Sequence, residues 1–214
     1  MTRAARRFLP LLGALAACSS APRDRSTGNP SAFGSSGNLP PGVSHVVRDQ
    51  YYDVVGADAS SLRLSMLANG PKPFQGRAEW NLRWTFGVRS RAGQCSVDDV
   101  RVGATVTITL PAWAPDSTAS PDLRAQWTAF VAALRRHEEG HRDIAIEGAR
   151  AVQRALRDAR TTTCAALSNE LQRAGREALA RVRARNDRYD QETNHGRTQG
   201  VSWPPRPAMI GSPR

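Results

Sequence analysis

The sequence contains a single lysine, Lys72, although 30 of its 214 residues are Lys or Arg. Almost all of the positive charge is therefore arginine, a bias that indicates a GC-rich coding sequence rather than a selected contact surface. The formal net charge of +11 would suit a nucleic-acid partner. The basic residues are scattered, however, and no nucleic-acid-binding motif accompanies them, so the sequence argues against a nucleic-acid partner.

The chain also lacks a long hydrophobic segment at its N-terminus. The apolar run Phe8 to Ala17 follows three arginines and is too short to span a bilayer, a pattern that predicts a secretory signal peptide over residues 1–17. The run ends in Leu-Ala-Ala before Cys18, which resembles the bacterial lipobox. We therefore expect Cys18 to carry a lipid that anchors the chain to a membrane. Because Ser19 is not the aspartate that signals inner-membrane retention, the expected location is the outer membrane, facing the periplasm.

Cysteine is scarce, with three residues in the whole chain. If Cys18 is lipidated, Cys95 and Cys164 remain as a pair in a compartment where disulfides persist. Neither has a neighbour at C-x-x-C spacing, which argues against their use as zinc ligands. We therefore expect a disulfide between Cys95 and Cys164.

Composition divides the chain into four parts, of which the signal peptide is the first. Residues 18–41 are rich in Ser, Gly, Pro and Asn and contain hardly any large apolar side chain, so they predict a flexible linker. Residues 42–196 carry the apolar periodicity of a folded domain. Residues 197–214 are rich in Pro and Gly and predict a poorly ordered tail.

Strand patterns occupy the first half of the expected domain. Residues 46–55 have strand composition, and 78–88 and 100–110 alternate apolar and polar side chains as half-buried strands do. The turn-rich segment 89–99 joins the last two, which predicts an antiparallel pair. A short helix is expected over 60–67. Because helical patterns follow the strands, the fold class is α+β.

Two long helices are predicted in the second half. The alanine-rich run 120–160 begins with Ser120, a good N-cap, and with Pro121, whose missing N–H costs nothing at the first helical position. A second helix is expected over 164–188, where apolar residues recur at spacings of three and four. The predicted order is thus antiparallel strands followed by two long helices.

The first long helix carries the motif H-E-x-x-H. His137 and His141 lie four residues apart, so a helix places both imidazoles on one face, where they can share a zinc ion. The helical wheel puts both histidines on the apolar stripe that faces the core. Two core histidines without a metal are the alternative, but their ligand spacing and the adjacent Glu138 favour a zinc site.

A catalytic zinc needs a third protein ligand and one open position. The metzincin continuation would require Gly and His where this chain has Ile144 and Glu147, so that pattern is absent. The candidates elsewhere in the chain are His195, Glu170, Asp190 and, more distantly, His45. We favour His195, because imidazole suits zinc and because this residue lies in a short polar run outside the helical packing.

The zinc site would support peptide hydrolysis. Zinc lowers the pKa of a bound water and polarises the scissile carbonyl, while Glu138 takes the proton of that water as general base and passes it to the leaving amine. Tyr189 is a candidate donor to the developing oxyanion, although it is equally explained as an amphipathic residue at a helix end. Asp143 or Asp190 is a candidate to orient one imidazole through a hydrogen bond to the ring nitrogen that does not bind the metal.

Several strings in the chain are specific enough to indicate a family. They are H-E-E-G-H-R-D at 137–143, T-N-H-G at 193–196, Y-Y-D-V-V-G at 51–56, Gly70-Pro71, the strand from Trp80 to Trp84, Cys95, L-P-A-W at 110–113 and the run 189–196. With these strings the chain resembles DUF922, a family of bacterial secreted proteins described as predicted zinc-dependent proteases. The resemblance implies zinc ligation by His137 and His141, with Glu138 as base, and supports His195 less directly.

The sequence therefore predicts a lipid-anchored envelope protein with a zincin-like domain over 42–196 that acts as a zinc metallopeptidase on peptide or protein substrates. The main alternative is a non-catalytic envelope-binding lipoprotein whose metal is structural or absent. The sequence carries no signal that fixes the oligomeric state.

Overall fold

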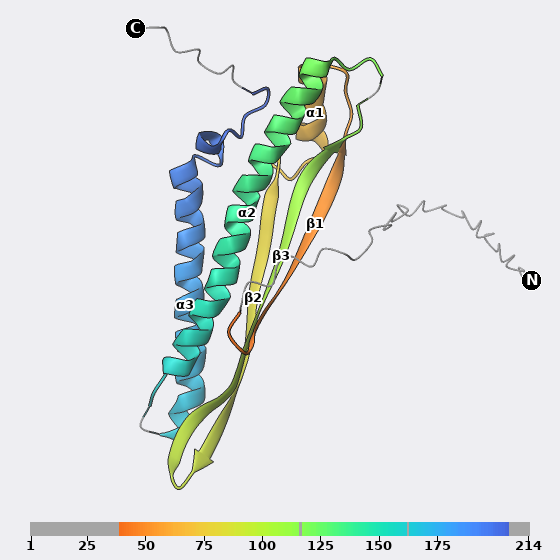
Figure 1. Ribbon diagram of the computed structural model, residues 1–214. Coiled ribbons are helices and arrows are strands. Elements are labelled where there is room, and N and C mark those ends of the chain that lie inside the picture. Colours follow the sequence, from red (N-terminus) through yellow and green to blue (C-terminus); the bar gives the residue numbers. More distant parts are fainter. Residues whose placement is uncertain (1–38, 116, 162, 206–214) are drawn as a thin grey trace, which may run out of the picture. The chain divides into compact units, whose positions relative to one another are not determined.

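The structure is a computed structural model that describes residues 39–115, 117–161 and 163–205 (Figure 1). The expected signal peptide, Cys18, most of the linker and the last nine residues of the chain lie outside these ranges. Strands come first and two long helices follow, so the chain is α+β. Within the described residues, no helix combines the length and apolar character needed to cross a membrane.

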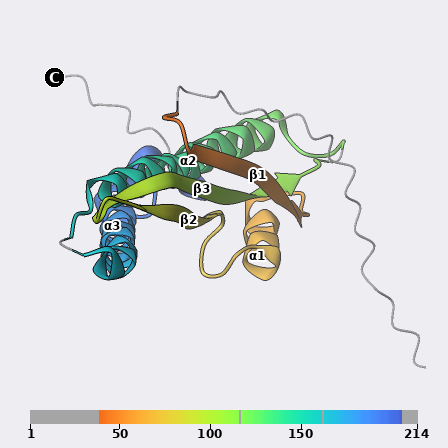
Figure 2. The ribbon, with the colours of Figure 1, turned by 90° about the horizontal axis from the view of Figure 1, so that it is seen from below.

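Three strands form one mixed sheet in the order β1-β3-β2, which can be followed in Figure 2. β1 (Val43–Val54) pairs in parallel with β3 (Gln94–Trp113), and β2 (Arg77–Arg91) pairs with β3 as the predicted antiparallel partner. The expected loop over 89–99 is wrong, because strand pairing continues out to the last pair, Arg91 with Gln94. A two-residue turn with positive φ at both positions closes this hairpin, as the twist of paired strands favours.

The short helix α1 (Ala59–Asn69) forms where the sequence predicted one. Its N-cap is Asp58, whose carboxylate accepts hydrogen bonds from the backbone of Ser60 and Ser61, while the Ser61 hydroxyl accepts one from the backbone of Asp58. This capping box satisfies donors that the first helical turn leaves free. α1 buries Leu62 and Met66 against the sheet.

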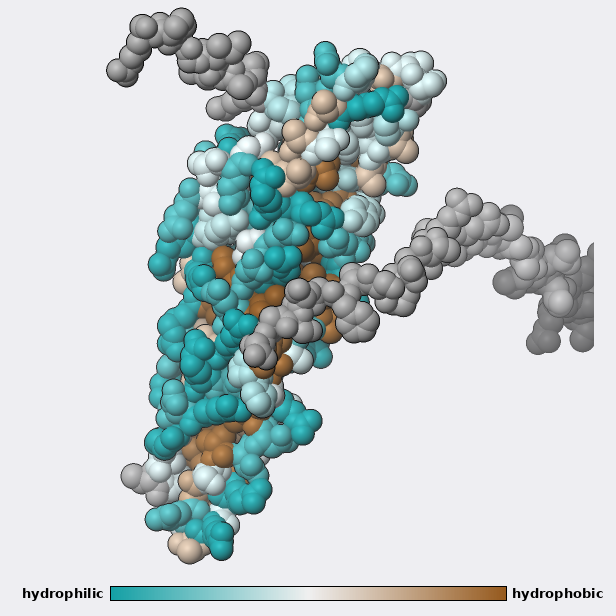
Figure 3. All heavy atoms as spheres, in the orientation of Figure 1, coloured by the Kyte–Doolittle hydropathy of each residue, from teal (hydrophilic) through white to brown (hydrophobic). Residues whose placement is uncertain are grey.

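The long helix α2 (Pro121–Asp158) lies along the sheet. Ser120 caps it as predicted, with its hydroxyl accepting the backbone N–H of Leu123 at 3.2 Å. Alternate residues of β3 are buried against it, from Val100 to Leu110, which places the core on one face of the sheet. The outward faces of the helices are largely hydrophilic (Figure 3).

The second long helix, α3 (Cys164–Thr193), packs against α2 and β2. Its approach to α2 is close because Gly148 has no side chain: a Cβ there would lie 2.7 Å from a methyl carbon of Val182. A disulfide joins Cys95 of β3 to Cys164 at the start of α3, with Cα atoms 5.3 Å apart. The predicted pairing of these cysteines is confirmed.

The segment after α3 differs from the poorly ordered tail that the sequence predicted. A single 3-10 turn, η1 (Arg197–Gln199), is followed by Val201 and Trp203, which are both buried. The Trp203 ring packs 5.3 Å from the ring of Trp127, and its indole N–H donates to the carbonyl of Ala59. Burial of this large aromatic side chain holds residues 197–205 onto the domain.

Candidate metal centre

The two histidines of the H-E-x-x-H string lie one turn apart on α2, as their spacing predicted. His137 is 4% exposed and His141 is 6% exposed, and their ring centroids are 4.9 Å apart. Both face the place where α3 and the segment before β2 approach α2. A helix fixes this side-by-side arrangement because residues four apart share a face.

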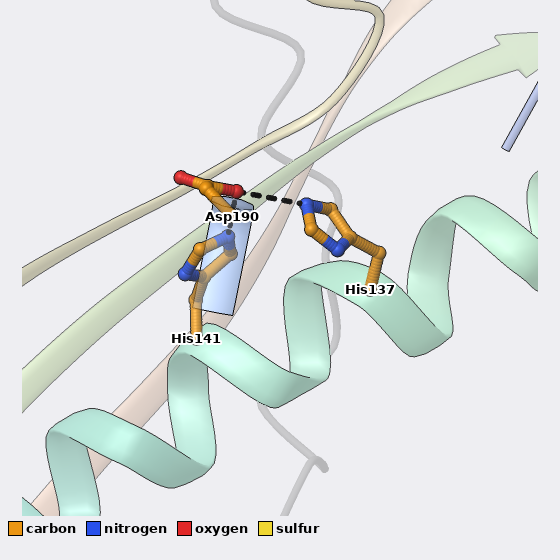
Figure 4. Close-up of side chains that lie close together, drawn as sticks. All are labelled: His137, His141 and Asp190. Carbon is orange, nitrogen blue, oxygen red and sulfur yellow. Dashed lines mark hydrogen bonds and ion pairs between the residues drawn. The ribbon is translucent and has the colours of Figure 1, made fainter. Parts of the chain in front are cut away.

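Asp190, near the end of α3, meets both imidazoles (Figure 4). Its Oδ1 atom is 3.3 Å from His137 Nε2 and 3.1 Å from His141 Nε2, and the three ligand atoms lie within 4.8 Å of one another. Around a tetrahedral zinc, with bonds of about 2.0–2.1 Å, ligand atoms lie roughly 3.3–3.4 Å apart. The group is therefore spaced as metal ligands are, and it could hold a metal ion.

The opposite nitrogen of each ring contacts a side-chain amide. His137 Nδ1 is 3.0 Å from Gln199 Oε1, and His141 Nδ1 is 2.8 Å from Asn186 Oδ1. An amide oxygen only accepts hydrogen bonds, so each Nδ1 carries the proton and each Nε2 of a neutral ring presents a lone pair. Those lone pairs face a carboxylate oxygen at 3.1 and 3.3 Å, an arrangement that is favourable when a proton or a metal ion lies between them.

The electrostatic surroundings keep His137 in the form that binds metals. Burial is the main effect that holds the pKa of His137 below its ordinary value, and the nearby His141 adds to it. A neutral imidazole is the metal-binding form of histidine. The lowered pKa of His137 thus favours the form that can bind a divalent metal.

Glu138 lies beside this group and is almost completely buried, with 4% of its surface exposed. Burial raises the pKa of its carboxyl group to about 7, although a hydrogen bond from the backbone of Ala78 opposes the shift. A carboxyl group with a pKa near neutrality can both accept and return a proton at physiological pH. This is the property that a general base requires.

A cavity of about 220 Å³ opens next to the cluster. Its walls include the segment leading into β2, from Phe74 to Ala78, together with His137, Glu138 and His141 from α2 and Asp190 from α3. The carboxylate of Glu138 and the ligand group therefore share one cavity, as a reaction at a bound substrate would require.

His195, the favoured third ligand in the sequence, lies at the rim of this cavity. Its Nδ1 atom is 3.6 Å from Asp190 Oδ1, and 54% of its side chain is exposed. Its ring packs against that of Phe74 with centroids 5.3 Å apart. The structure places it next to the group formed by His137, His141 and Asp190, and its role as a ligand stays a prediction.

Tyr189 packs between the two imidazoles, stacked on His137 and edge-on to His141. Its hydroxyl is 3.2 Å from the carbonyl oxygen of His137 and accepts a hydrogen bond from Gln199 Nε2. Tyr189 is not among the residues that line the cavity. These contacts favour a role in holding the histidine rings, and the predicted role at an oxyanion stays a prediction.

Four further residues considered from the sequence lie away from the ligand group. Glu170 pairs with Arg173 and stands 20 positions before Asp190, about 30 Å along α3, so it cannot complete the group. His45 lies within β1 and does not line the cavity. Asp143 is ion-paired with Arg142 rather than with an imidazole. Cys95, like its partner Cys164, is consumed by the disulfide.

Sequence reasoning missed the two amides that hold the histidines. Asn186 had a detectable signal, because it extends the three- and four-residue spacing of the apolar stripe of α3 with a polar side chain. Gln199 had none, since it lies in the segment whose composition predicts a tail. Its contact with His137 depends on how that segment returns across α2.

A family model described as "Bacterial protein of unknown function (DUF922)" matches residues 49–196. This range contains His137, His141 and Asp190 and ends just before Gln199. No curated protein and no solved structure matches the chain. The family description names no activity, so the chemistry has to be argued from the site.

Proposed function

The chain belongs to the DUF922 family of bacterial proteins, and on this basis and that of its site we propose that it is a zinc-dependent peptidase of the cell envelope. One observation carries the proposal. Two imidazole Nε2 atoms and one carboxylate oxygen converge at ligand spacing, and an amide oxygen at each Nδ1 atom favours the tautomer whose Nε2 atom is unprotonated. Such a group could hold a metal ion.

The donor set favours zinc in an open site. His137, His141 and Asp190 supply two imidazoles and one carboxylate, a ligand set typical of catalytic zinc, in which a fourth position stays free. A structural zinc would instead have four protein ligands. When bound, zinc supplies Lewis-acid chemistry, polarising a carbonyl group and lowering the pKa of water.

Glu138 is the proposed general base. Its carboxylate accepts the proton of the attacking water and returns it to the nitrogen of the leaving amine. Burial raises the pKa of this carboxyl group to about 7 in the absence of a metal, and a nearby cation would favour the carboxylate form that accepts the proton. The backbone of Ala78, which lines the same cavity, interacts with this carboxyl group and lowers its pKa, so Glu138 lies beside the cavity where a substrate would bind.

A peptide is the substrate class that best matches the walls of the cavity. β2 is an edge strand of the sheet, and the backbone that leads into it, Gly76 to Ala78, lines the cavity. An edge strand offers unpaired backbone groups with which an extended peptide can pair. The position of a long H-E-x-x-H helix along such a sheet also supports a zincin-like fold.

An exported, lipid-anchored setting is part of the proposal. The disulfide between Cys95 and Cys164 is of the kind that persists in oxidising compartments such as the periplasm. The signal-like N-terminus and the lipobox-like string before Cys18 support export and attachment to the outer membrane. The substrates would then be peptides or proteins of the envelope.

The test compares purified wild-type protein with Glu138→Gln, using Glu139→Gln as the matched control because Glu139 is partly exposed and paired with Arg142. We expect all three to bind zinc, and only Glu138→Gln to lose hydrolysis of a mixed peptide library, by more than about 100-fold. A protein with no bound zinc, whose melting temperature is unchanged by chelators, would overturn the metal. Zinc binding without hydrolysis by the wild type would identify a non-catalytic envelope module instead.

A further inference from the structure

We propose that Trp80 and Asn186 are positioning residues that set the tautomer of His141 and so keep its Nε2 atom available to a metal. The inference rests on the proposed metal centre, but it concerns side chains that contact a ligand histidine and not the metal itself. Trp80 lies on β2, Asn186 on α3 and His141 on α2, so three elements contribute one residue each.

The contact is a single amide oxygen shared by two rings. Asn186 Oδ1 is 3.0 Å from the indole Nε1 of Trp80 and 2.8 Å from Nδ1 of His141. All three side chains are at least partly buried, and Asn186 lies one helical turn before Asp190. The amide oxygen of Asn186 therefore contacts one nitrogen of the His141 ring, Nδ1, while the other nitrogen, Nε2, faces Asp190.

Trp80 fixes which end of the amide faces the histidine. An indole N–H can only donate, so the group that meets it must be the amide oxygen and not the amide nitrogen. The second lone pair of that oxygen then accepts from His141, which forces the proton onto Nδ1. With the proton there, Nε2 is left as a lone-pair donor toward Asp190.

Without the indole donor, the amide is free to turn over. Its NH₂ group would then donate to Nδ1, and the proton of a neutral His141 would move to Nε2, where it blocks metal binding. The role of Trp80 is thus to exclude the wrong tautomer, although the indole touches neither the cavity nor an expected ligand atom of the metal.

His137 provides an internal contrast. Its Nδ1 contacts Gln199, whose amide meets the hydroxyl of Tyr189 on the other side. The hydroxyl can donate either to the carbonyl of His137 at 3.2 Å or to Gln199 Oε1 at 3.4 Å, so it constrains the orientation of Gln199 less strictly than an indole constrains Asn186. Only His141 therefore has its tautomer fixed through a donor-only group, and loss of Trp80 should change the tautomer of His141 but not that of His137.

The experiment uses Trp80→Phe with Trp84→Phe as matched control. Trp84 lies on the same strand and packs on Gly175 of α3, and its indole makes no hydrogen bond within the described residues. In metal-free protein with ¹⁵N-labelled histidine, above the pH range where the ring titrates, long-range ¹H–¹⁵N spectra report the tautomer. We expect His141 to be protonated at Nδ1 in the wild type and in Trp84→Phe, and to gain the Nε2-protonated form in Trp80→Phe.

Zinc affinity, measured by competition with a chelator, is the second readout. Outer-shell partners of ligating histidines typically contribute about 10–100-fold to metal affinity, so Trp80→Phe and Asn186→Leu should lose affinity in that range. Asn186→Asp keeps acceptor oxygens toward both rings and should retain the tautomer. Trp84→Phe should stay within about threefold of wild type.

An unchanged Nδ1–H signal of His141 in Trp80→Phe would overturn the proposal, as would equal losses in Trp80→Phe and Trp84→Phe. The tautomer is read without metal or substrate, so it decides this inference even if the protein shows no peptidase activity. Failure of the wild type to bind zinc would instead count against the proposed function.

Discussion

Asp190 is the residue on which the imidazoles converge, and its substitution separates the two candidates for the third ligand. We expect Asp190→Asn to lower zinc affinity by more than about 100-fold, beyond the usual effect of an outer-shell group, because a direct ligand is lost. His195→Ala, which removes a half-exposed ring at 3.6 Å from Asp190, should lower it by less than about tenfold. Chelator competition measures both. The reverse ranking would make His195 the ligand.

Glu138 should make the metal-free protein pH-sensitive. Burial raises its pKa from 4.5 to about 7, so the folded state binds this proton more tightly than the unfolded chain does. The resulting stability is fully present below pH 4.5 and is lost as the pH rises through about 7. Relative to Glu138→Gln, the free energy of unfolding should fall by up to about 3 kcal/mol across this window.

Urea unfolding of both proteins, with a chelator present throughout, measures this difference. Parallel pH profiles for wild type and Glu138→Gln would show that the carboxyl group titrates normally. The chelator is needed because a bound cation near Glu138 would favour the carboxylate and reduce the shift.

The parts of the site that could be predicted lie on one helix. His137, Glu138 and His141 follow from sequence because helical geometry alone places them, without knowledge of the rest of the fold. Asp190 is one of several candidates in the sequence, since its meeting with the histidines depends on how α3 packs against α2. The contacts of Asn186 and Gln199 depend on side-chain orientation as well, which spacing does not encode.

The helices α2 and α3 approach each other closely at Gly140. A Cβ at this position would lie 2.1 Å from the hydroxyl oxygen of Tyr189. Gly140→Ala should therefore destabilise the protein, although alanine favours a helix by about 1 kcal/mol over glycine. In a Tyr189→Ala background the same change should stabilise, because the ring that it would meet is gone.

A double-mutant cycle by urea unfolding compares the two backgrounds. The same sign of effect in both would mean that the ring of Tyr189 moves aside without cost. Tyr189 also stacks on the ring of His137, so the single variant Gly140→Ala should disturb the histidine pair along with the packing.

The sequence predicted element boundaries that depend on neighbouring residues, such as a helix cap. It missed boundaries that depend on pairing between two strands. Ser120 and Pro121 mark the start of α2 because a cap and a proline act within one turn. The continuation of β2 and β3 to a tight hairpin has no such local mark, since residues 89–99 are polar and rich in turn formers. Cross-strand pairing stabilises these residues as strand, and pairing is a property of two segments rather than one.

The disulfide ties the β2–β3 hairpin to the start of α3, and Figure 1 shows both at the same end of the domain. Its cysteines are 69 positions apart in the chain, so the cross-link removes much conformational freedom from the unfolded state. Replacing both Cys95 and Cys164 by serine should lower the free energy of unfolding by about 4 kcal/mol.

Denaturant unfolding measures this loss, and zinc affinity serves as the control. Cys164 and Asn186 are 22 positions apart on α3, about 33 Å along the helix, so the metal group should keep its affinity in the folded serine variant. A large loss of affinity would show that the disulfide also sets the packing of α3 at the metal end.

The histidine group is assembled from α2, α3 and the segment around Gln199, which reach one another only in the folded chain. This arrangement sets an order of events. Until α3 has packed against α2, the two imidazoles and the carboxylate of Asp190 are apart, and Gln199 has not reached His137. If the group binds zinc as proposed, tight metal binding must follow this packing, so the folded chain rather than an extended one is the form that gains hydrolytic activity.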